Sequence, residues 1–232
     1  VAPQSPAQEH VHSTAVSAPR IEPPKIFLDK SPRIVEYQLR RLDNQRLLLV
    51  ERKTDDKKYI PVYTAILSRV GMSPQFQEEA VEALVKLNQS YPGSILLDAI
   101  ATLDPDDRDQ RRAARQLASM LLRQEPEVLK NQTDPINEAT QADSPLIRSI
   151  GMAALIVSGQ ADIAVAKLKE GEQAQLAFLS AIELVPNVNK RSSLRDQVLS
   201  LLGQSDATPI RRAAISALGF IRHKQDATFK LV

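Results

Sequence analysis

Apolar residues recur three and four positions apart in many short blocks from about Ile26 onward, and Pro, Gly, Asp or Ser separates the blocks. This spacing puts the apolar side chains on one face of a helix, whereas a half-buried strand would alternate apolar and polar residues. The pattern therefore predicts an all-α protein of short amphipathic helices, arranged either as an α-solenoid or as an irregular bundle. The expected helices span residues 32–41, 43–52, 60–70, 74–89, 94–103, 106–124, 126–131, 145–158, 161–169, 173–185, 191–203 and 208–222.

Four of these blocks open with a hydroxyl residue followed by proline. They are Ser31-Pro32, Ser73-Pro74, Ser144-Pro145 and Thr208-Pro209. A hydroxyl at the N-cap accepts a hydrogen bond from a free N–H of the first turn, and proline at the first helical position gives up an N–H that has no partner there. We therefore expect four helix starts. Phosphorylation of Ser-Pro sites is the alternative, but capping accounts for all four pairs without a kinase.

An internal repeat relates residues 143–157 to residues 206–220 without gaps. The identical pairs are Asp143/Asp206, Ile147/Ile210, Arg148/Arg211, Ala154/Ala217 and Leu155/Leu218. In the second copy, 3.6 residues per turn would put Arg212, Ser216 and Gly219 on one side and bring the following residues together on the opposite face: Ile210, Ala213, Ala214, Ala217, Leu218 and Ile221. The repetition favours the solenoid over the bundle.

The order Asp, Ile-Arg, Ala and Ala-Leu resembles the second helix of a HEAT-type repeat, the helix-pair unit of many α-solenoids. The resemblance implies a right-handed α-α superhelix in which 161–169 pairs with 173–185, and 191–203 with 208–222, at about thirty residues per unit. It is weaker over 73–124. The expected organisation is a disordered tether (1–25), an irregular N-terminal helical cap (26–72) and HEAT-like helical repeats (73–232) that continue beyond the end of the chain.

Residues 25–67 do not resemble a HEAT unit. They resemble a stretch of exported planctomycete proteins in which helical repeats precede a c-type cytochrome domain. That resemblance implies a helical accessory domain of an exported redox protein. The haem would belong to a downstream domain, because this chain has no Cys-x-x-Cys-His sequence. No cofactor is expected on the chain itself.

The composition narrows the functional classes. The 232 residues include no cysteine, which excludes disulfides, thiolate zinc sites, iron–sulfur ligation and cysteine nucleophiles within the chain. The net charge of +2 provides no strong overall field for a polyanion. No apolar run approaches the length of a membrane span. The first 25 residues are rich in Pro, Ala, Ser and Gln and lack an initiator Met, so we expect an exported or periplasmic location, with the cytoplasm as the alternative.

No catalytic or metal constellation can be assembled from the sequence. There are three histidines, no Gly-x-Ser-x-Gly elbow and no glycine-rich phosphate loop. The carboxylate pairs Glu78-Glu79 and Asp55-Asp56 are adjacent in sequence, so they do not face one another on a helix. His10 and His12 have no nameable third metal ligand. We therefore expect a non-enzymatic protein without a small-molecule substrate.

Two Asp-to-Arg pairs at equivalent positions are the candidate structural residues. The HEAT resemblance implies that Asp143, Arg148, Asp206 and Arg211 form a ladder that fixes the stacking of neighbouring units. Anion binding at the helix N-terminus is the alternative for the two arginines. Arg212 has no counterpart in the first copy, where Ser149 stands, and we expect it to point away from the core.

Two basic clusters are the candidate binding residues. One holds Arg211, Arg212, Arg222, His223 and Lys224, and the other holds Arg111, Arg112, Arg115 and Arg123. Neither has interleaved aromatic residues, and aspartates at 104, 106, 107 and 109 adjoin the second, so nucleic-acid binding is the least favoured function. The charged run 51–59 reads as a solvated loop where a partner can dock.

The sequence thus predicts a scaffold that binds another protein or a neighbouring domain of the same polypeptide. Its candidate partner contacts are Arg111, Arg112, Arg212, Arg222 and Lys224.

Overall fold

The computed structural model describes residues 22–221, which form fourteen α-helices and two short 3-10 segments, with no strand in this range. The all-α prediction is confirmed. The α-helices are α1 (Pro32–Arg40), α2 (Asn44–Leu48), α3 (Ile60–Leu67), α4 (Pro74–Asn88), α5 (Pro92–Ala101), α6 (Arg108–Leu122), α7 (Pro126–Lys130), α8 (Thr133–Ala139), α9 (Pro145–Val157), α10 (Ala161–Ala166), α11 (Glu172–Leu184), α12 (Val188–Ser192), α13 (Arg195–Gln204) and α14 (Thr208–Leu218). The 3-10 segments are η1 (Lys57–Tyr59) and η2 (Lys167–Glu170).

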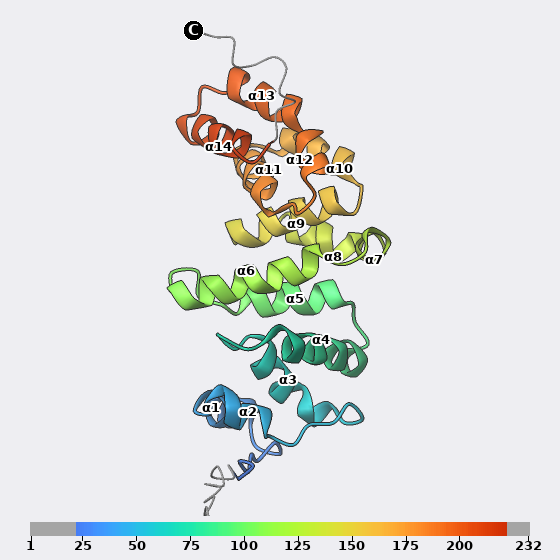
Figure 1. The fold of residues 1–232 in the computed structure, drawn as a ribbon, viewed down its shortest axis with the longest axis vertical. Coiled ribbons are helices and arrows are strands. Elements are labelled where there is room, and N and C mark those ends of the chain that lie inside the picture. The colour runs from blue at the N-terminus through green and yellow to red at the C-terminus, as the bar shows by residue number, and fades with distance from the viewer. Residues whose placement is uncertain (1–21, 222–232) are drawn as a thin grey trace, which may run out of the picture.

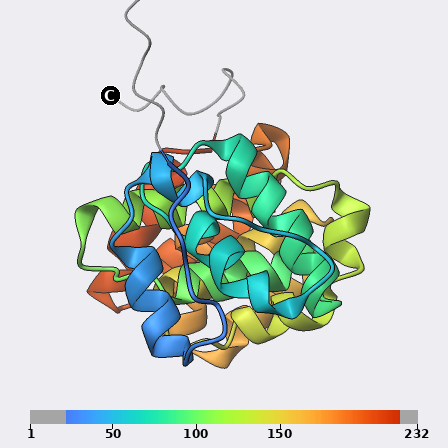
Figure 2. The same cartoon turned by 90° about the horizontal axis from the view of Figure 1, so that it is seen from below.

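The helices follow one another along the longest axis of the molecule, with α1 and α2 at one end and α13 and α14 at the other (Figure 1). The end-on view in Figure 2 shows the successive helices lying over one another. Helices that are neighbours in sequence pack as pairs: α3 on α4, α5 on α6, α8 on α9, and α13 on α14. Helices α6, α9, α11 and α14 form a continuous row, each contacting the next. Packing is therefore mainly serial.

Proline, rather than the hydroxyl, is what the four expected helix starts share. Ser31, Ser73 and Ser144 are the N-caps of α1, α4 and α9, as predicted, but no hydroxyl accepts a cap bond there. Helix α14 starts at Thr208 itself, with Ala207 as N-cap. The expected capping bond was therefore wrong at all four sites. Carboxylate and amide oxygens do make such bonds elsewhere, at the N-caps of α2, α6 and α12.

Helix α8 has no counterpart among the helices expected from the sequence. Pro135 lies in the first turn of α8, where a backbone N–H needs no partner within the helix. The segment expected to be one helix at 161–169 forms the α-helix α10 followed by the 3-10 segment η2. The segment expected to be one helix at 191–203 is divided between α12 and α13. The Ser193 hydroxyl donates to the Lys190 carbonyl at the end of α12, a bond that competes with the helical backbone bonds.

Helix α9 lies at the centre of the stack, and every residue from Ser149 to its C-cap Ser158 is buried. Its Gly151 faces the end of α8: a Cβ there would lie 2.8 Å from the backbone N of Thr140 and 3.0 Å from the carbonyl carbon of Ala139. Backbone atoms cannot move aside as a flexible side chain can. Gly151 therefore sets the close approach of α8 and α9.

Replacing Gly151 with alanine should lower the free energy of unfolding by about 2 kcal/mol, because overpacking outweighs the gain in helix propensity of about 1 kcal/mol. Gly203 is the matched control, since it is also helical but a Cβ there would meet nothing within 4 Å. Gly203→Ala should raise the free energy of unfolding by about 0.5 kcal/mol. Urea unfolding followed by circular dichroism measures both, and a stabilising Gly151→Ala would contradict the close packing of α8 on α9.

Two buried glutamines join helices that are distant in sequence or adjacent in the stack. The Gln132 Oε1 accepts from the backbone N–H of Gly93 at 2.6 Å, which satisfies an amide at the start of α5. The Gln77 Nε2 donates to the Leu67 carbonyl at the end of α3 at 2.9 Å, and its Oε1 accepts from Gln116 of α6 at 2.5 Å. Helix ends inside the stack are thus satisfied by side chains from other helices.

Candidate functional site

Arg148 lies at the start of α9, where its guanidinium donates to the Ala142 carbonyl at 2.8 Å. Within residues 22–221, no ion pair joins Asp143 or Asp206 to Arg148 or Arg211, and both aspartates are exposed. The structure gives Arg148 a backbone acceptor in place of the carboxylate that the ladder required. The carbonyl of the turn between α8 and α9 needs a donor, whereas the exposed Asp143 is solvated.

The exposed face of α6 carries Arg108, Arg111, Arg112 and Arg115 at helical spacing. Arg112 approaches Asp109 at 3.5 Å, and both side chains are largely exposed. The Asp107 side chain caps the helix by accepting from the amides of Asp109 and Gln110. Arginines and aspartates are therefore interspersed at this end of α6, as the sequence predicted.

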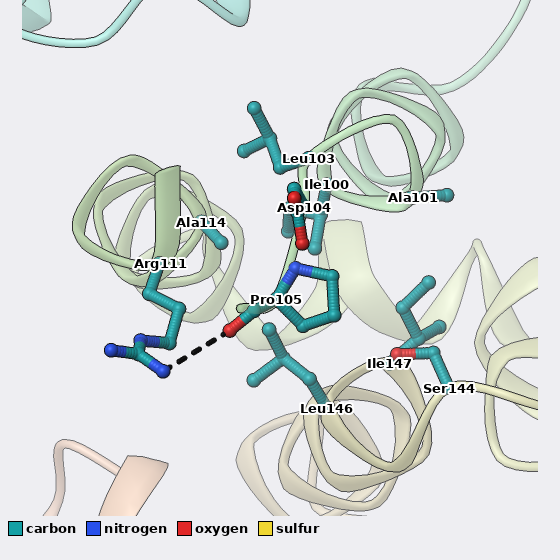
Figure 3. Close-up of a pocket in the computed structure, with 10 residues that line it drawn as sticks. All are labelled: Ile100, Ala101, Leu103, Asp104, Pro105, Arg111, Ala114, Ser144, Leu146 and Ile147. Atoms are coloured by element: carbon teal, nitrogen blue, oxygen red, sulfur yellow. Dashed lines mark hydrogen bonds between the residues drawn. The ribbon is translucent and has the colours of Figure 1, made fainter. Parts of the chain in front are cut away.

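A small pocket of about 130 Å³ lies between the end of α5, the start of α6 and the start of α9. Its walls are mainly apolar, with Leu103, Leu146 and Ile147 around it, and Arg111 reaches past it to the Pro105 carbonyl at 3.3 Å (Figure 3). Sites for drug-sized molecules generally have about 300–1,000 Å³. The pocket is smaller than such sites.

The outward side of α14 carries a shallow depression of about 340 Å³ lined by Thr208, Arg211, Arg212 and Ile215. Ile215 is 62% exposed, the largest exposed fraction among the large apolar residues of the described part. Arg211 and Arg212 are both exposed, so Arg212 points away from the core as expected, and Arg211 does so as well. We call these four residues the α14 face. Arg222, His223 and Lys224 lie outside the described residues, as do His10 and His12.

The charged run between α2 and α3 is largely exposed and has local ion pairs, but the expectation of a fully solvated loop was wrong, because it ends in η1 with Tyr59 buried in the core. Lys53 approaches Glu51 at 3.0 Å, and Lys58 approaches Asp56 at 3.2 Å. The hydrogen bond from Lys53 and its positive charge lower the pKa of Glu51. The backbone N–H and the ammonium of Lys58 lower the pKa of Asp56. Both carboxylates are thus paired with lysines of the same segment.

Arg69, a residue that the sequence analysis did not single out, secures the C-terminal end of α1. Its guanidinium donates to the Leu39 carbonyl at 2.9 Å and to the Leu42 carbonyl at 3.0 Å. Burial lowers the pKa of Arg69. The Leu39 carbonyl also accepts from the amides of Arg41 and Leu42, so Arg69 adds a donor there, supplies one to Leu42, and joins α1 to the loop that follows α3.

The outer side of α1 and the segment before it form a surface that the sequence analysis also missed. It consists of Lys25, Phe27, Ile34, Tyr37 and Arg41, all exposed, and we call it the N-terminal face. The Arg41 guanidinium lies over the Tyr37 ring and the Lys25 ammonium over the Phe27 ring, each 5.5 Å from the ring centroid. Ile34 and Tyr37 are three residues apart, and Val35 and Leu39 are four apart. Both spacings are typical of one helix face, so the sequence does not show which of the two pairs is buried.

The described residues contain no group of three or more His, Asp or Glu side chains placed to hold a metal ion. None of the helices in residues 22–221 is both long enough and apolar enough to span a bilayer. Comparisons of the chain with models of known families, with curated proteins and with solved structures found no match.

Proposed function

We propose that this chain is a HEAT-like, right-handed α-solenoid that serves as a non-enzymatic protein-interaction module. The serial packing supports the solenoid: paired helices follow one another, and α6, α9, α11 and α14 form a row of second helices. Asp143 and Asp206, the first residues of the two repeat copies, are 63 positions apart. That distance is two units of about thirty residues, and α11 with its preceding segments fills the unit between them.

The α14 face is the observation that carries the interaction function. Ile215 presents a large apolar side chain to solvent, and Arg211 and Arg212 flank it in one depression. Protein interfaces combine apolar residues at their centre with enriched arginine, and a few such residues supply most of the affinity. An isoleucine beside two arginines has the composition of such a centre. The partner is a protein or a neighbouring domain of the same polypeptide.

Site-specific photocrosslinking tests this function. A photoreactive benzoylphenylalanine replaces Ile215 in the protein produced in its own cells, and irradiation should yield one covalent adduct with a single other protein, identified by mass spectrometry. The purified adduct partner must then bind the purified chain. Leu199 of α13 is the matched control position, because it is also an exposed apolar residue on a C-terminal helix.

The crosslinking experiment has a supporting and a contradicting outcome. An adduct at position 215 that is absent at position 199, and that is lost when Arg211 and Arg212 are replaced by glutamate, supports the proposal. Equal adducts at both positions, or no adduct at position 215, contradict it. The predicted alternatives, an accessory role in a redox assembly and nucleic-acid binding, stay predictions.

A further inference from the structure

Helix α1 has a buried side and a side turned to solvent with a distinct composition. Val35 and Leu39 are buried, and Tyr37 lies opposite them at about 100° per residue. Ile34 and Arg41 fall on one side of Tyr37, and Arg33 and Arg40 fall on the other; all of these residues are exposed. The solvent side of α1 is thus an apolar and aromatic centre flanked by arginines.

The segment before α1 extends this surface. The backbone N–H of Phe27 donates to the Gln38 Oε1 at 3.2 Å, and the Gln38 Nε2 donates to the Ile34 carbonyl. Phe27 is therefore held beside the Ile34 edge of the helix. Phe27 and Ile34 are each 48% exposed, and Tyr37 is 59% exposed. Three large apolar side chains project into solvent from one small surface.

The charge of this surface is positive. Residues 25–41 contain the cations Lys25, Lys30, Arg33, Arg40 and Arg41 and only two acids, Asp29 and Glu36. No ion pair within residues 22–221 involves any of these seven side chains. Glu36 lies about 100° from Tyr37 around the helix, at the edge next to Arg33 and Arg40, so no acid lies between Ile34, Tyr37 and Arg41.

We propose that the N-terminal face binds the surface of an anionic lipid bilayer. Aromatic rings with a polar tip and short apolar side chains are favourable at the boundary between headgroups and acyl chains. Lysine and arginine beside them are attracted to anionic lipids. The face combines both features on a helix whose apolar core side is already occupied by the protein, so binding requires no unfolding of α1.

A lipid surface fits this face better than a nucleic acid does. Single-stranded nucleic acids bind in positively charged grooves and stack their bases on open aromatic rings. Here Arg41 and Lys25 already lie over the rings of Tyr37 and Phe27, and α1 lies at the outer edge of the molecule (Figure 2). Exposed Ile34 gains nothing from phosphate or base contacts, whereas it is stabilised by insertion among lipids.

This inference is independent of the proposed protein-binding function. Helix α1 lies at one end of the stack and α14 at the other (Figure 1). A protein bound to a bilayer through α1 would therefore leave the α14 face accessible. Either proposal can fail while the other stands.

Flotation of the full chain with vesicles tests the proposal. The chain should bind phosphatidylcholine vesicles that contain about 30% phosphatidylglycerol and should not bind phosphatidylcholine alone. Binding should fall steeply at about 0.5 M NaCl, because salt screens the attraction. Each arginine removed from the solvent side of α1 should weaken binding about fivefold, so the triple variant Arg33→Gln, Arg40→Gln, Arg41→Gln should bind about a hundredfold more weakly.

Two controls keep the test specific. The triple variant Lys57→Gln, Lys130→Gln, Lys169→Gln removes the same charge from other exposed positions and should keep its affinity within about twofold. The chain contains no tryptophan, so Tyr37→Trp introduces a single fluorescent reporter. Its emission should shift to shorter wavelength on anionic vesicles, whereas Leu199→Trp should show no shift. Circular dichroism verifies that each variant is folded.

Equal loss of binding in the two triple variants would overturn the proposal, and so would an unshifted Tyr37→Trp emission on bound protein. Vesicle binding that is absent at low salt also overturns it. Tight binding of single-stranded DNA that depends on the same arginines would reassign the face to nucleic acid. A concentration-dependent dimer that the arginine variant abolishes would reassign it to a second copy of the chain.

Discussion

Replacing Phe178 with alanine should destabilise the protein by about 4 kcal/mol, the largest effect expected of any single substitution considered. Phe178 lies on α11 and is 0% exposed. Helix α11 packs against both α9 and α14, so the cavity opens where the C-terminal helices join the centre of the stack. The loss combines the transfer free energy of the ring with the cost of a cavity that rigid neighbouring helices cannot fill. Urea unfolding followed by circular dichroism measures it.

Phe27→Ala is the matched control, because Phe27 is half exposed and belongs to the N-terminal face. It should lower the free energy of unfolding by less than about 1 kcal/mol. A Phe178→Ala variant as stable as Phe27→Ala would mean that α11 does not join the C-terminal helices to the central ones. An unfolding transition that splits into two steps would agree with serial packing, since contacts in such a stack are mostly between near neighbours.

Arg69→Ala should destabilise the protein by about 3 kcal/mol, because it removes two hydrogen bonds from a charged group and leaves the Leu42 carbonyl without a donor. The Leu39 carbonyl at the end of α1 still accepts from the amides of Arg41 and Leu42. The substitution also removes a cation from the negative end of the helix dipole. Hydrogen exchange should show the amides of α1 losing protection before those of α5 or α9.

Arg115→Ala provides the comparison, because Arg115 is exposed on α6. Its effect should stay within about 0.5 kcal/mol. Arg69→Lys should restore part of the lost stability, since an ammonium keeps the charge but cannot span both carbonyls as the planar guanidinium does. If Arg69→Ala were no more destabilising than Arg115→Ala, α1 would be held by its apolar contacts alone.

The sequence was sufficient to predict the all-α class and most helices, because apolar spacing follows directly from which face of each helix is buried. Helix α8 was not predicted. It contains Pro135, a residue that usually interrupts a helix but is tolerated in the first turn, where no intrahelical hydrogen bond is lost. Gly151 could not be assigned a role, because its importance arises from the backbone of α8 approaching it in space. The same holds for Gln132, which bonds an amide 39 positions away.

The candidate surfaces were predicted less completely. Arg211 and Arg212 were singled out, but only the structure places both on one exposed depression with Ile215. The N-terminal face was missed because a sequence shows apolar residues without showing which are buried. In α1 the core takes Val35 and Leu39, which leaves Ile34 and Tyr37 outside. The cations that cover the rings come from both ends of the segment.

The central claim is that this helical stack binds another protein through the α14 face. Isothermal titration of the purified chain with the protein crosslinked at position 215 tests it most directly, using Ile215→Asp and the control Leu199→Asp. Burial of an unpaired charge at the centre of an interface should raise the Kd of Ile215→Asp by about tenfold or more, and Leu199→Asp should stay within about twofold of the unmodified chain. Equal dissociation constants for both variants would contradict the claim.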